Sequence, residues 1–156
     1  MKIKIIALGK IKEKFLHDGI DEFLKRLTPY CSMEIIELPP IEIKDTNLTL
    51  KVLEQEGEKI LSHIKPHSFV ITMEITGNQL SSEEFAQKIK EISISGAGEL
   101  VFVIGSSCGI SPIVSKRANY KLSISKMTFL HQFARLLLVE QIYRAFKILN
   151  NESYHK

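Results

Sequence analysis

Residues 100–110, Leu-Val-Phe-Val-Ile-Gly-Ser-Ser-Cys-Gly-Ile, hold the pattern that decides the fold. The apolar run Leu100–Ile104 is followed at once by a loop of glycine, serine and cysteine. A strand that is apolar at every position is typical of a parallel sheet covered by helices on both faces. The sequence therefore predicts a buried strand with a glycine loop at its carboxyl end.

Other short segments rich in Ile, Val and Phe are also predicted to be strands. They are Ile3–Leu8, Ile35–Leu38, Phe69–Ile75 and Tyr120–Ile124. Apolar residues at helical spacing lie between or after them, in residues 11–27, 53–64, 85–92 and 131–149. Ser81 and Glu84 have the spacing of a capping box at the start of the third helix. Alternating strands and helices predict an α/β fold with a mostly parallel sheet flanked by helices.

Length and composition indicate one domain over residues 1–156, because 44% hydrophobic residues can fill one core in a chain of 156 residues. No internal repeat or linker interrupts it, and the polar residues 39–47 are interpreted as a surface loop. No apolar run is long enough to span a bilayer, and the first residues do not resemble a signal peptide, so we expect a cytoplasmic protein without membrane contact.

The two cysteines, Cys31 and Cys108, lie far apart and lack the spacing of metal ligands. We therefore expect free thiols, with no disulfide framework and no metal site. Cys108 lies in the glycine loop, where it could be a nucleophile or a small packing residue. No histidine is close in sequence to activate it, which favours packing.

Charge is distributed unevenly along the chain. Residues 1–110 carry 13 basic and 16 acidic side chains, whereas residues 111–156 carry 8 and 2. Lysines also crowd the N-terminus at Lys2, Lys4, Lys10, Lys12 and Lys14. Such basic regions can attract the phosphate backbone of RNA, or they can simply be solvated surface.

The last predicted helix, residues 131–149, is apolar around most of its circumference. A helix of this kind needs cover on both sides. One side can pack on the sheet, and the other can meet a second subunit. A helix buried within the monomer is the alternative, but we expect a single sheet of short strands to offer little material to enclose it, which favours a homodimer.

Two loops at strand ends are candidates for a ligand site. The first strand ends in Ala7-Leu8-Gly9-Lys10, which contains neither a GxGxxG fingerprint nor a phosphate-binding loop. Glycine and serine follow the fourth strand at residues 105–110, and a second loop follows the fifth strand at residues 125–130. Ligands of open parallel sheets bind beyond the carboxyl ends of the strands, so these loops could bracket a purine and its ribose. They could equally be ordinary connections.

Side-chain pairs on the last helix are also informative. His131 and Arg135 stand four residues apart on one helix face, where they could contact a phosphate or a carboxylate. Glu140 and Arg144 have the same spacing and are interpreted as a structural ion pair.

The chain ends in Tyr154, His155 and Lys156. This tail combines an aromatic ring, an imidazole and a cation, which are suited to stacking on a base, handling a proton and binding a phosphate.

Several of these segments together resemble the ribosomal RNA large subunit methyltransferase H family. The resemblance rests on NYKLSISKMTFLHQ at 119–132, VEQIYRAFKI at 139–148 and YHK at 154–156, and MKIKIIALGKIKEKF, EGEKIL and VFVIG fit as well. It covers essentially the whole chain. It implies a SPOUT fold with a C-terminal trefoil knot, a homodimer, S-adenosyl-L-methionine as cofactor and the ribosome as partner. The implied substrate is a pseudouridine in helix 69 of 23S rRNA, methylated at N3 on the assembled ribosome.

The resemblance also implies a set of site residues. Arg135, Tyr154 and His155 fall on positions near the target base, with the tail completing the partner subunit's site. The cofactor positions fall on Met73, Gly105, Ile124, Ser125, Lys126, Met127, Thr128 and Phe129.

For such a reaction we expect direct transfer, in which the base loses its N3 proton and this nitrogen attacks the sulfonium methyl group in line, without a covalent enzyme intermediate. Proximity of the reacting atoms would supply much of the acceleration. His155 is the hypothetical proton acceptor, and binding of a phosphate is its alternative role.

The chain departs from the family pattern at Ser106, Cys108 and Leu130, where the family commonly has glycine, a polar residue and proline. Ser106 is expected to crowd the cofactor, and Leu130 to loosen a bend that proline would fix. The competing hypotheses are a SPOUT methyltransferase acting on another RNA, such as transfer RNA, and a paralogue that binds rRNA or the cofactor without turnover.

Overall fold

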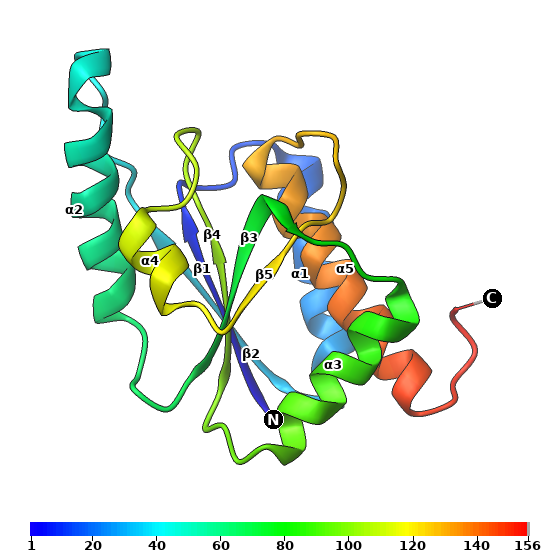
Figure 1. Ribbon diagram of the computed structural model, residues 1–156. Helices are drawn as coiled ribbons and strands as arrows, with labels where there is room; N and C mark the ends of the chain where they lie inside the picture. Colours follow the sequence, from blue (N-terminus) through cyan, green and yellow to red (C-terminus); the bar gives the residue numbers. More distant parts are fainter. Residues whose placement is uncertain (156) are drawn as a thin grey trace.

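A computed structural model describes residues 1–155 as a parallel sheet between two layers of helices (Figure 1). The strands are β1 (Lys2–Leu8), β2 (Ser32–Leu38), β3 (Phe69–Asn78), β4 (Leu100–Ile104) and β5 (Tyr120–Leu122). The helices are α1 (Lys14–Leu27), η1 (Thr46–Leu48, a 3₁₀ turn), α2 (Thr49–Ser62), α3 (Ser82–Ile94), α4 (Pro112–Arg117) and α5 (His131–Leu149). This architecture confirms the predicted α/β fold class.

The sheet has the order β2-β1-β4-β3-β5, and all neighbouring strands run parallel. Helices α1, α3 and α5 cover one face and α2 and α4 cover the other (Figure 1). Every residue of β4 is buried, because this strand lies at the centre of the sheet with a helical layer on each side. Because all strands run parallel, their carboxyl ends lie at one edge of the sheet, and the glycine loop begins at this edge.

Most predicted elements are confirmed, several of them with different bounds. Strand β4 has the predicted bounds, but β2 begins at Ser32 and β3 continues to Asn78. Strand β5 ends at Leu122, two residues before the predicted end. Helix α4 and the turn η1 were not predicted. Both are short, and η1 lies next to the exposed loop of residues 39–45.

The predicted capping box is present at the start of α3. The Ser81 hydroxyl accepts a hydrogen bond from the Glu84 backbone N–H at 3.1 Å, and the Glu84 carboxylate accepts one from the Ser81 N–H at 2.7 Å. Two of the donors that a helix start leaves unpaired are thus satisfied, which fixes where α3 begins.

Helix α5 is more enclosed within the subunit than its sequence pattern indicated. It lies between α1 and α3, and the buried positions in its middle include Leu138, Val139, Ile142 and Tyr143. The expectation that the monomer has little material to enclose it was wrong, because these two flanking helices supply the cover. Apolar exposure is confined to the first turn and the preceding loop, where Leu130 is 67% exposed.

A buried ion pair lies at the amino end of the sheet. Lys4 of β1 and Glu99, just before β4, are both nearly inaccessible, and Lys4 Nζ lies 3.4 Å from Glu99 Oε1. The Ser68 hydroxyl donates to the same carboxylate oxygen at 2.9 Å. The pair links two neighbouring strands at the edge opposite the glycine loop.

In the part of the chain that the structure describes, no helix is both long and apolar enough to cross a membrane. The trefoil knot implied by the resemblance stays a prediction, as does the single-domain boundary at residues 1–156.

Candidate functional site

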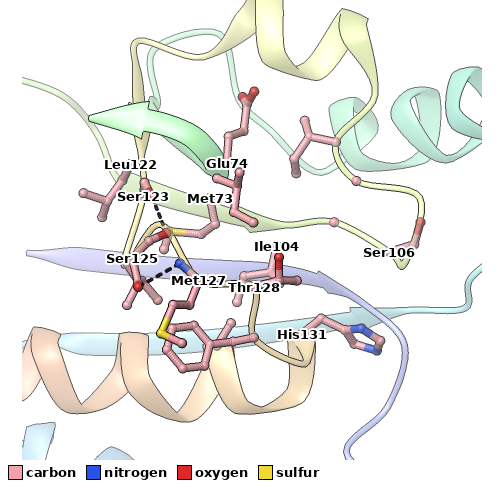
Figure 2. Close-up of a pocket in the computed structure, with 17 residues that line it drawn as sticks. Met73, Glu74, Ile104, Ser106, Leu122, Ser123, Ser125, Met127, Thr128 and His131 are labelled. Carbon is pink, nitrogen blue, oxygen red and sulfur yellow. Dashed lines mark hydrogen bonds between the residues drawn. The ribbon is translucent and has the colours of Figure 1, made fainter. Parts of the chain in front are cut away.

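A cavity of about 150 Å³ lies at the carboxyl ends of β3, β4 and β5, beside the first turn of α5 (Figure 2). A wider cavity of about 740 Å³ adjoins it and shares most of its lining residues. The smaller cavity is bounded by the strand ends and by the loops that follow β4 and β5. Its lining comprises Met73, Glu74, Ile75, Ile104, Gly105, Ser106, Gly109, Ile110, Leu122, Ser123, Ile124, Ser125, Met127, Thr128, Phe129, His131 and Ala134.

The loop after β4 turns back sharply on itself. A Cβ atom at Gly105 would lie 2.3 Å from the carbonyl oxygen of Gly109, so only glycine allows this approach of the backbone. Gly109 has φ +90°, a left-handed conformation that side chains disfavour. Its N–H donates to the Ser106 carbonyl oxygen at 2.9 Å. The two glycines therefore permit a compact turn whose inner surface faces the cavity.

The loop after β5 is shaped by its own serines. The buried Ser123 hydroxyl donates to the Ser125 carbonyl oxygen at 2.8 Å, and the Ser125 hydroxyl accepts from the Met127 N–H at 3.0 Å (Figure 2). Short polar side chains of this kind satisfy local backbone groups and hold irregular loops in one shape. The Ser125 and Met127 side chains are thereby held at the cavity.

Nearly all the cofactor residues implied by the resemblance come together in this cavity. The lining includes Met73, Gly105, Ile124, Ser125, Met127, Thr128 and Phe129. Lys126 does not line it, and its side chain is exposed. The structure thus brings the two predicted loops to one place, whereas their binding of a cofactor stays a prediction.

His131 is the histidine that lines the cavity. It begins α5, and Figure 2 places it on the same side of the cavity as Ser106. Partial burial lowers the pKa of the imidazole below its ordinary value, and the cations of Arg135 and Lys12 lower it further. These effects favour the neutral form of the imidazole, whose ring nitrogens offer one donor and one acceptor.

Arg135 does not face the cavity. Its side chain is only 1% exposed, and its guanidinium donates to Glu37 Oε2 at 2.6 Å and to the Gly9 carbonyl oxygen at 2.9 Å. Glu37 Oε2 also accepts from the Ile11 N–H at 3.1 Å. The carboxylate that Arg135 contacts belongs to Glu37 of the same subunit, so contact of the His131 and Arg135 pair with an anionic ligand stays a prediction. In this subunit Arg135 fastens α5 to the ends of β1 and β2, and its proximity to the target base stays a prediction.

Tyr154 and His155 lie against the same subunit, away from the cavity. The Tyr154 hydroxyl donates to Glu140 Oε1 at 3.0 Å, and burial together with this carboxylate raises the tyrosine pKa. His155 Nε2 lies 2.6 Å from Glu83 Oε1, and its Nδ1 lies 3.3 Å from Arg144 Nη1. Neither residue lines the cavity. Lys156 lies outside the described residues.

The predicted pair of Glu140 and Arg144 is confirmed, with 2.7 Å between Oε1 and Nη2. Arg144 also lies over the Tyr154 ring, with its Cζ 4.7 Å from the ring centroid. Both residues of the ion pair thus also contact Tyr154 of the C-terminal tail.

Several residues of the cavity wall were not predicted from the sequence. Glu74 lines it in β3, with its carboxylate turned toward α4, where it accepts from the Ser115 hydroxyl at 3.2 Å. Ile104 and Leu122 line it as well. They are the last residues of β4 and β5. For Ile104 the predicted strand end was an available signal, whereas the fifth strand was predicted to continue two residues beyond Leu122.

Among residues 1–155, no three His, Cys, Asp or Glu side chains are grouped as metal ligands. The cavity is lined by the His131 imidazole, hydroxyls, backbone amides and carbonyls, and apolar groups, whereas Glu74 lines it with its carboxylate turned toward α4.

Comparison with known sequences agrees with this geometry. The sequence model of the family described as "Predicted SPOUT methyltransferase" matches residues 1–155. The chain belongs to the SPOUT methyltransferases. Within these methyltransferases, the chain is 51% identical to the ribosomal RNA large subunit methyltransferase H of Clostridium botulinum (strain 657 / Type Ba4). It is 49% identical to the protein of that name from Enterococcus faecalis (strain ATCC 700802 / V583). Both comparisons cover 100% of this chain and 100% of the relative, which confirms membership of the methyltransferase H family.

Comparison of structures finds a protein with a similar fold. A probable methylase family protein from Haemophilus influenzae Rd KW20 aligns with a TM-score of 0.53 over 99% of this chain and 70% of that chain. Its sequence identity is 15%, so this similarity concerns the fold alone. The family therefore identifies the chain as a methyltransferase, and the fold agrees with it.

Proposed function

We propose that the chain transfers a methyl group from S-adenosyl-L-methionine to N3 of pseudouridine 1915 in helix 69 of 23S rRNA, on the assembled ribosome in the cytoplasm. The observation that carries the proposal is the cavity at the ends of β3, β4 and β5, which is lined by the positions that the family resemblance assigns to the cofactor. The names of the full-length relatives support ribosomal RNA of the large subunit as the substrate.

The residues present suit this cofactor. Met73, Ile104 and Leu122 give the cavity an apolar wall, which suits a purine ring. Gly105 lacks the Cβ that would collide with Gly109, so the backbone of the turn can approach a ligand closely. The cofactor contains no phosphate, which agrees with the absence of a phosphate-binding loop after β1. When bound, it supplies an electrophilic methyl group.

The chain's own residues would then bind, orient and exclude water. The loop of residues 123–130 presents backbone amides and carbonyls in a shape fixed by Ser123 and Ser125. Arg135 acts in this subunit by holding the first turns of α5, and with them His131, against β1 and β2. Such fixed positions contribute to catalysis by preorganising the site.

The proposed role of His155 is to accept the proton from N3 of the target base, or else to bind a phosphate next to that base. A neutral imidazole with its hydrogen on Nε2 satisfies both contacts of the tail, since it donates to Glu83 and accepts from Arg144. In this position of the tail, the Nδ1 lone pair accepts from Arg144. To accept a proton from the base, His155 would have to break this hydrogen bond to Arg144, or act at the site of a second subunit.

A second copy of the chain is the proposed partner for an exposed apolar surface at the cavity. Met127 is 74% exposed and Leu130 67%, and they are accompanied by Phe129, Phe133 and Phe15. The rings of Phe15 and Phe133 lie 6.0 Å apart, so α1 and α5 contribute to one surface. Exposed apolar groups of this density are typical of protein interfaces. Sedimentation equilibrium tests this part: the mass of a dimer for the wild type and the mass of a monomer for Leu130→Asp are expected, and a monomeric wild type would exclude the homodimer.

The function is tested with ribosomes that lack the modification. Purified protein and cofactor labelled in the methyl group are incubated with these ribosomes, and the labelled nucleotide is mapped by mass spectrometry. Label at N3 of pseudouridine 1915 supports the proposal. Label in another RNA supports a SPOUT methyltransferase of different specificity. Cofactor binding measured by calorimetry without any transfer would support a non-catalytic paralogue.

A further inference from the structure

Glu56 is a buried carboxylate that the proposed mechanism does not use. It lies in the middle of α2 on the side that packs toward the sheet, and its side chain is 1% exposed. A buried carboxylate is costly unless its oxygens accept hydrogen bonds. Both of them do: Oε1 accepts from the Ile41 N–H at 3.2 Å, and Oε2 accepts from the Ser106 hydroxyl at 3.0 Å.

Ser106 connects Glu56 to the turn after β4 through further hydrogen bonds. Its hydroxyl also accepts from the Cys108 N–H at 3.3 Å, and its carbonyl oxygen accepts from the Gly109 N–H at 2.9 Å. One residue therefore organises two backbone amides of the turn. Since Ser106 lines the cavity, the shape of the cavity wall depends on where this hydroxyl is held.

The next residue of α2 keeps the helix close to this segment. A Cβ atom at Gly57 would lie 2.3 Å from Ser111 Oγ and 2.8 Å from Ile113 Cγ1, so only glycine allows α2 to approach the start of α4. Both ends of the segment between β4 and α4 are thus fixed by adjacent residues of α2, one through a hydrogen bond and one through close packing.

We propose that Glu56 is a positioning residue for the cofactor, which acts by holding the Ser106 hydroxyl and through it the turn of residues 105–109. The inference rests on the proposed function. It also gives Ser106 a defined role at a position where the family commonly has glycine. Besides the crowding of the cofactor expected from its side chain, Ser106 supplies the hydroxyl that donates to Glu56 of α2.

Two variants change the contact from opposite sides. Glu56→Gln keeps the size of the side chain, but with its amide oxygen toward the Ile41 N–H its amide nitrogen can only donate to the Ser106 hydroxyl, which therefore loses its charged acceptor. Ser106→Ala removes the hydroxyl and leaves the backbone unchanged. Glu58→Gln is the matched control, because Glu58 is an exposed carboxylate on the same helix.

The primary measurement is the Kd for S-adenosyl-L-methionine by titration calorimetry. A hydrogen bond to a charged group is stronger than one between neutral groups, and we expect a part of its loss to appear in binding as a roughly tenfold higher Kd in either variant. The double variant should have a Kd no higher than that of the single variant with the higher Kd, because both changes act on the same hydrogen bond. At saturating cofactor, kcat should stay within about twofold while KM for the cofactor rises.

Hydrogen exchange of the protein without cofactor reads the turn directly. The amides of Cys108 and Gly109 should exchange faster in Glu56→Gln and Ser106→Ala than in the wild type or Glu58→Gln. Unchanged Kd and unchanged exchange in Ser106→Ala would overturn the inference, and this variant decides the matter even if Glu56→Gln fails to fold. If the wild type binds no cofactor, the proposed function fails, whereas the exchange experiment still tests the hold of Glu56 on the turn.

Discussion

Replacing Arg135 separates a structural role from direct contact with RNA. The guanidinium is buried and makes two charged hydrogen bonds, to Glu37 Oε2 and to the Gly9 carbonyl oxygen. In Arg135→Met both bonds are lost while most of the side-chain volume remains. Each bond is worth about 1.5–3 kcal/mol at most. Because Glu37 is 36% exposed, water solvates its carboxylate in the variant and reduces the loss.

We therefore expect the free energy of unfolding to fall by about 2–4 kcal/mol, which corresponds to a Tm lower by about 4–16 °C for a chain of this size. Urea unfolding followed by circular dichroism measures it, at one fixed protein concentration, because self-association would add to the apparent stability. Glu37→Gln is the control. Its amide oxygen can still accept from Arg135, so a loss of only about 1 kcal/mol is expected.

The reasoning would be refuted by one combination of results. If Arg135→Met unfolds within about 0.5 kcal/mol of the wild type and yet loses methylation at saturating cofactor, the residue acts on the RNA or on the reacting atoms. A destabilised variant that still methylates ribosomes at a temperature well below its Tm agrees with the positioning role.

Buried or crowded groups elsewhere in the subunit give three more predictions. Gly105→Ala should weaken cofactor binding at least about tenfold in calorimetry, because its Cβ would lie 2.3 Å from the Gly109 carbonyl oxygen; an unchanged Kd would mean that the turn yields easily. The lowered pKa of His131 means that the unfolded chain takes up the proton first as the pH falls, so stability present above about pH 6.5 should be lost below it. His131→Gln should flatten this loss in urea unfolding at about pH 5.5–7.5, and an identical slope in both proteins would contradict the assignment. Lys4→Met should lower the free energy of unfolding by about 3–5 kcal/mol, because it leaves the Glu99 carboxylate buried without its cation. The double variant Lys4→Met/Glu99→Leu should recover part of the loss, and no recovery would show that the two residues act independently.

How much of the fold the sequence predicts depends on how each element is buried. The run Leu100–Ile104 gives correct bounds because every position of β4 is enclosed by two helical layers. Strand β2 lies at the edge of the sheet and is only half buried, so its first residues, Ser32–Glu34, carry no continuous apolar signal. Helix α4 is too short for a helical period, although Pro112 at its first position was a usable sign.

The candidate site was predictable where it follows strand ends, and hidden where it depends on contacts between distant residues. The loops at 105–110 and 125–130 meet because parallel strands end at one edge. Glu56 looks like a solvated helix residue, yet it shares the inward face of α2 with Val52, Leu53 and Ile60. A carboxylate within an apolar stripe was the signal. Its partners, Ile41 and Ser106, lie 15 and 50 residues away, so no local pattern could reveal them.

The strand order has a consequence for how the protein is made. The central strand β4 pairs with β1, whose partner residues lie almost a hundred positions earlier, and Arg135 fastens the last helix to the ends of β1 and β2. A fold dominated by such distant pairings forms slowly, since large loops must close before contacts reward them. The nascent chain therefore cannot complete the cavity at the ends of β3, β4 and β5 from an N-terminal fragment, and activity should arise only after translation has reached α5.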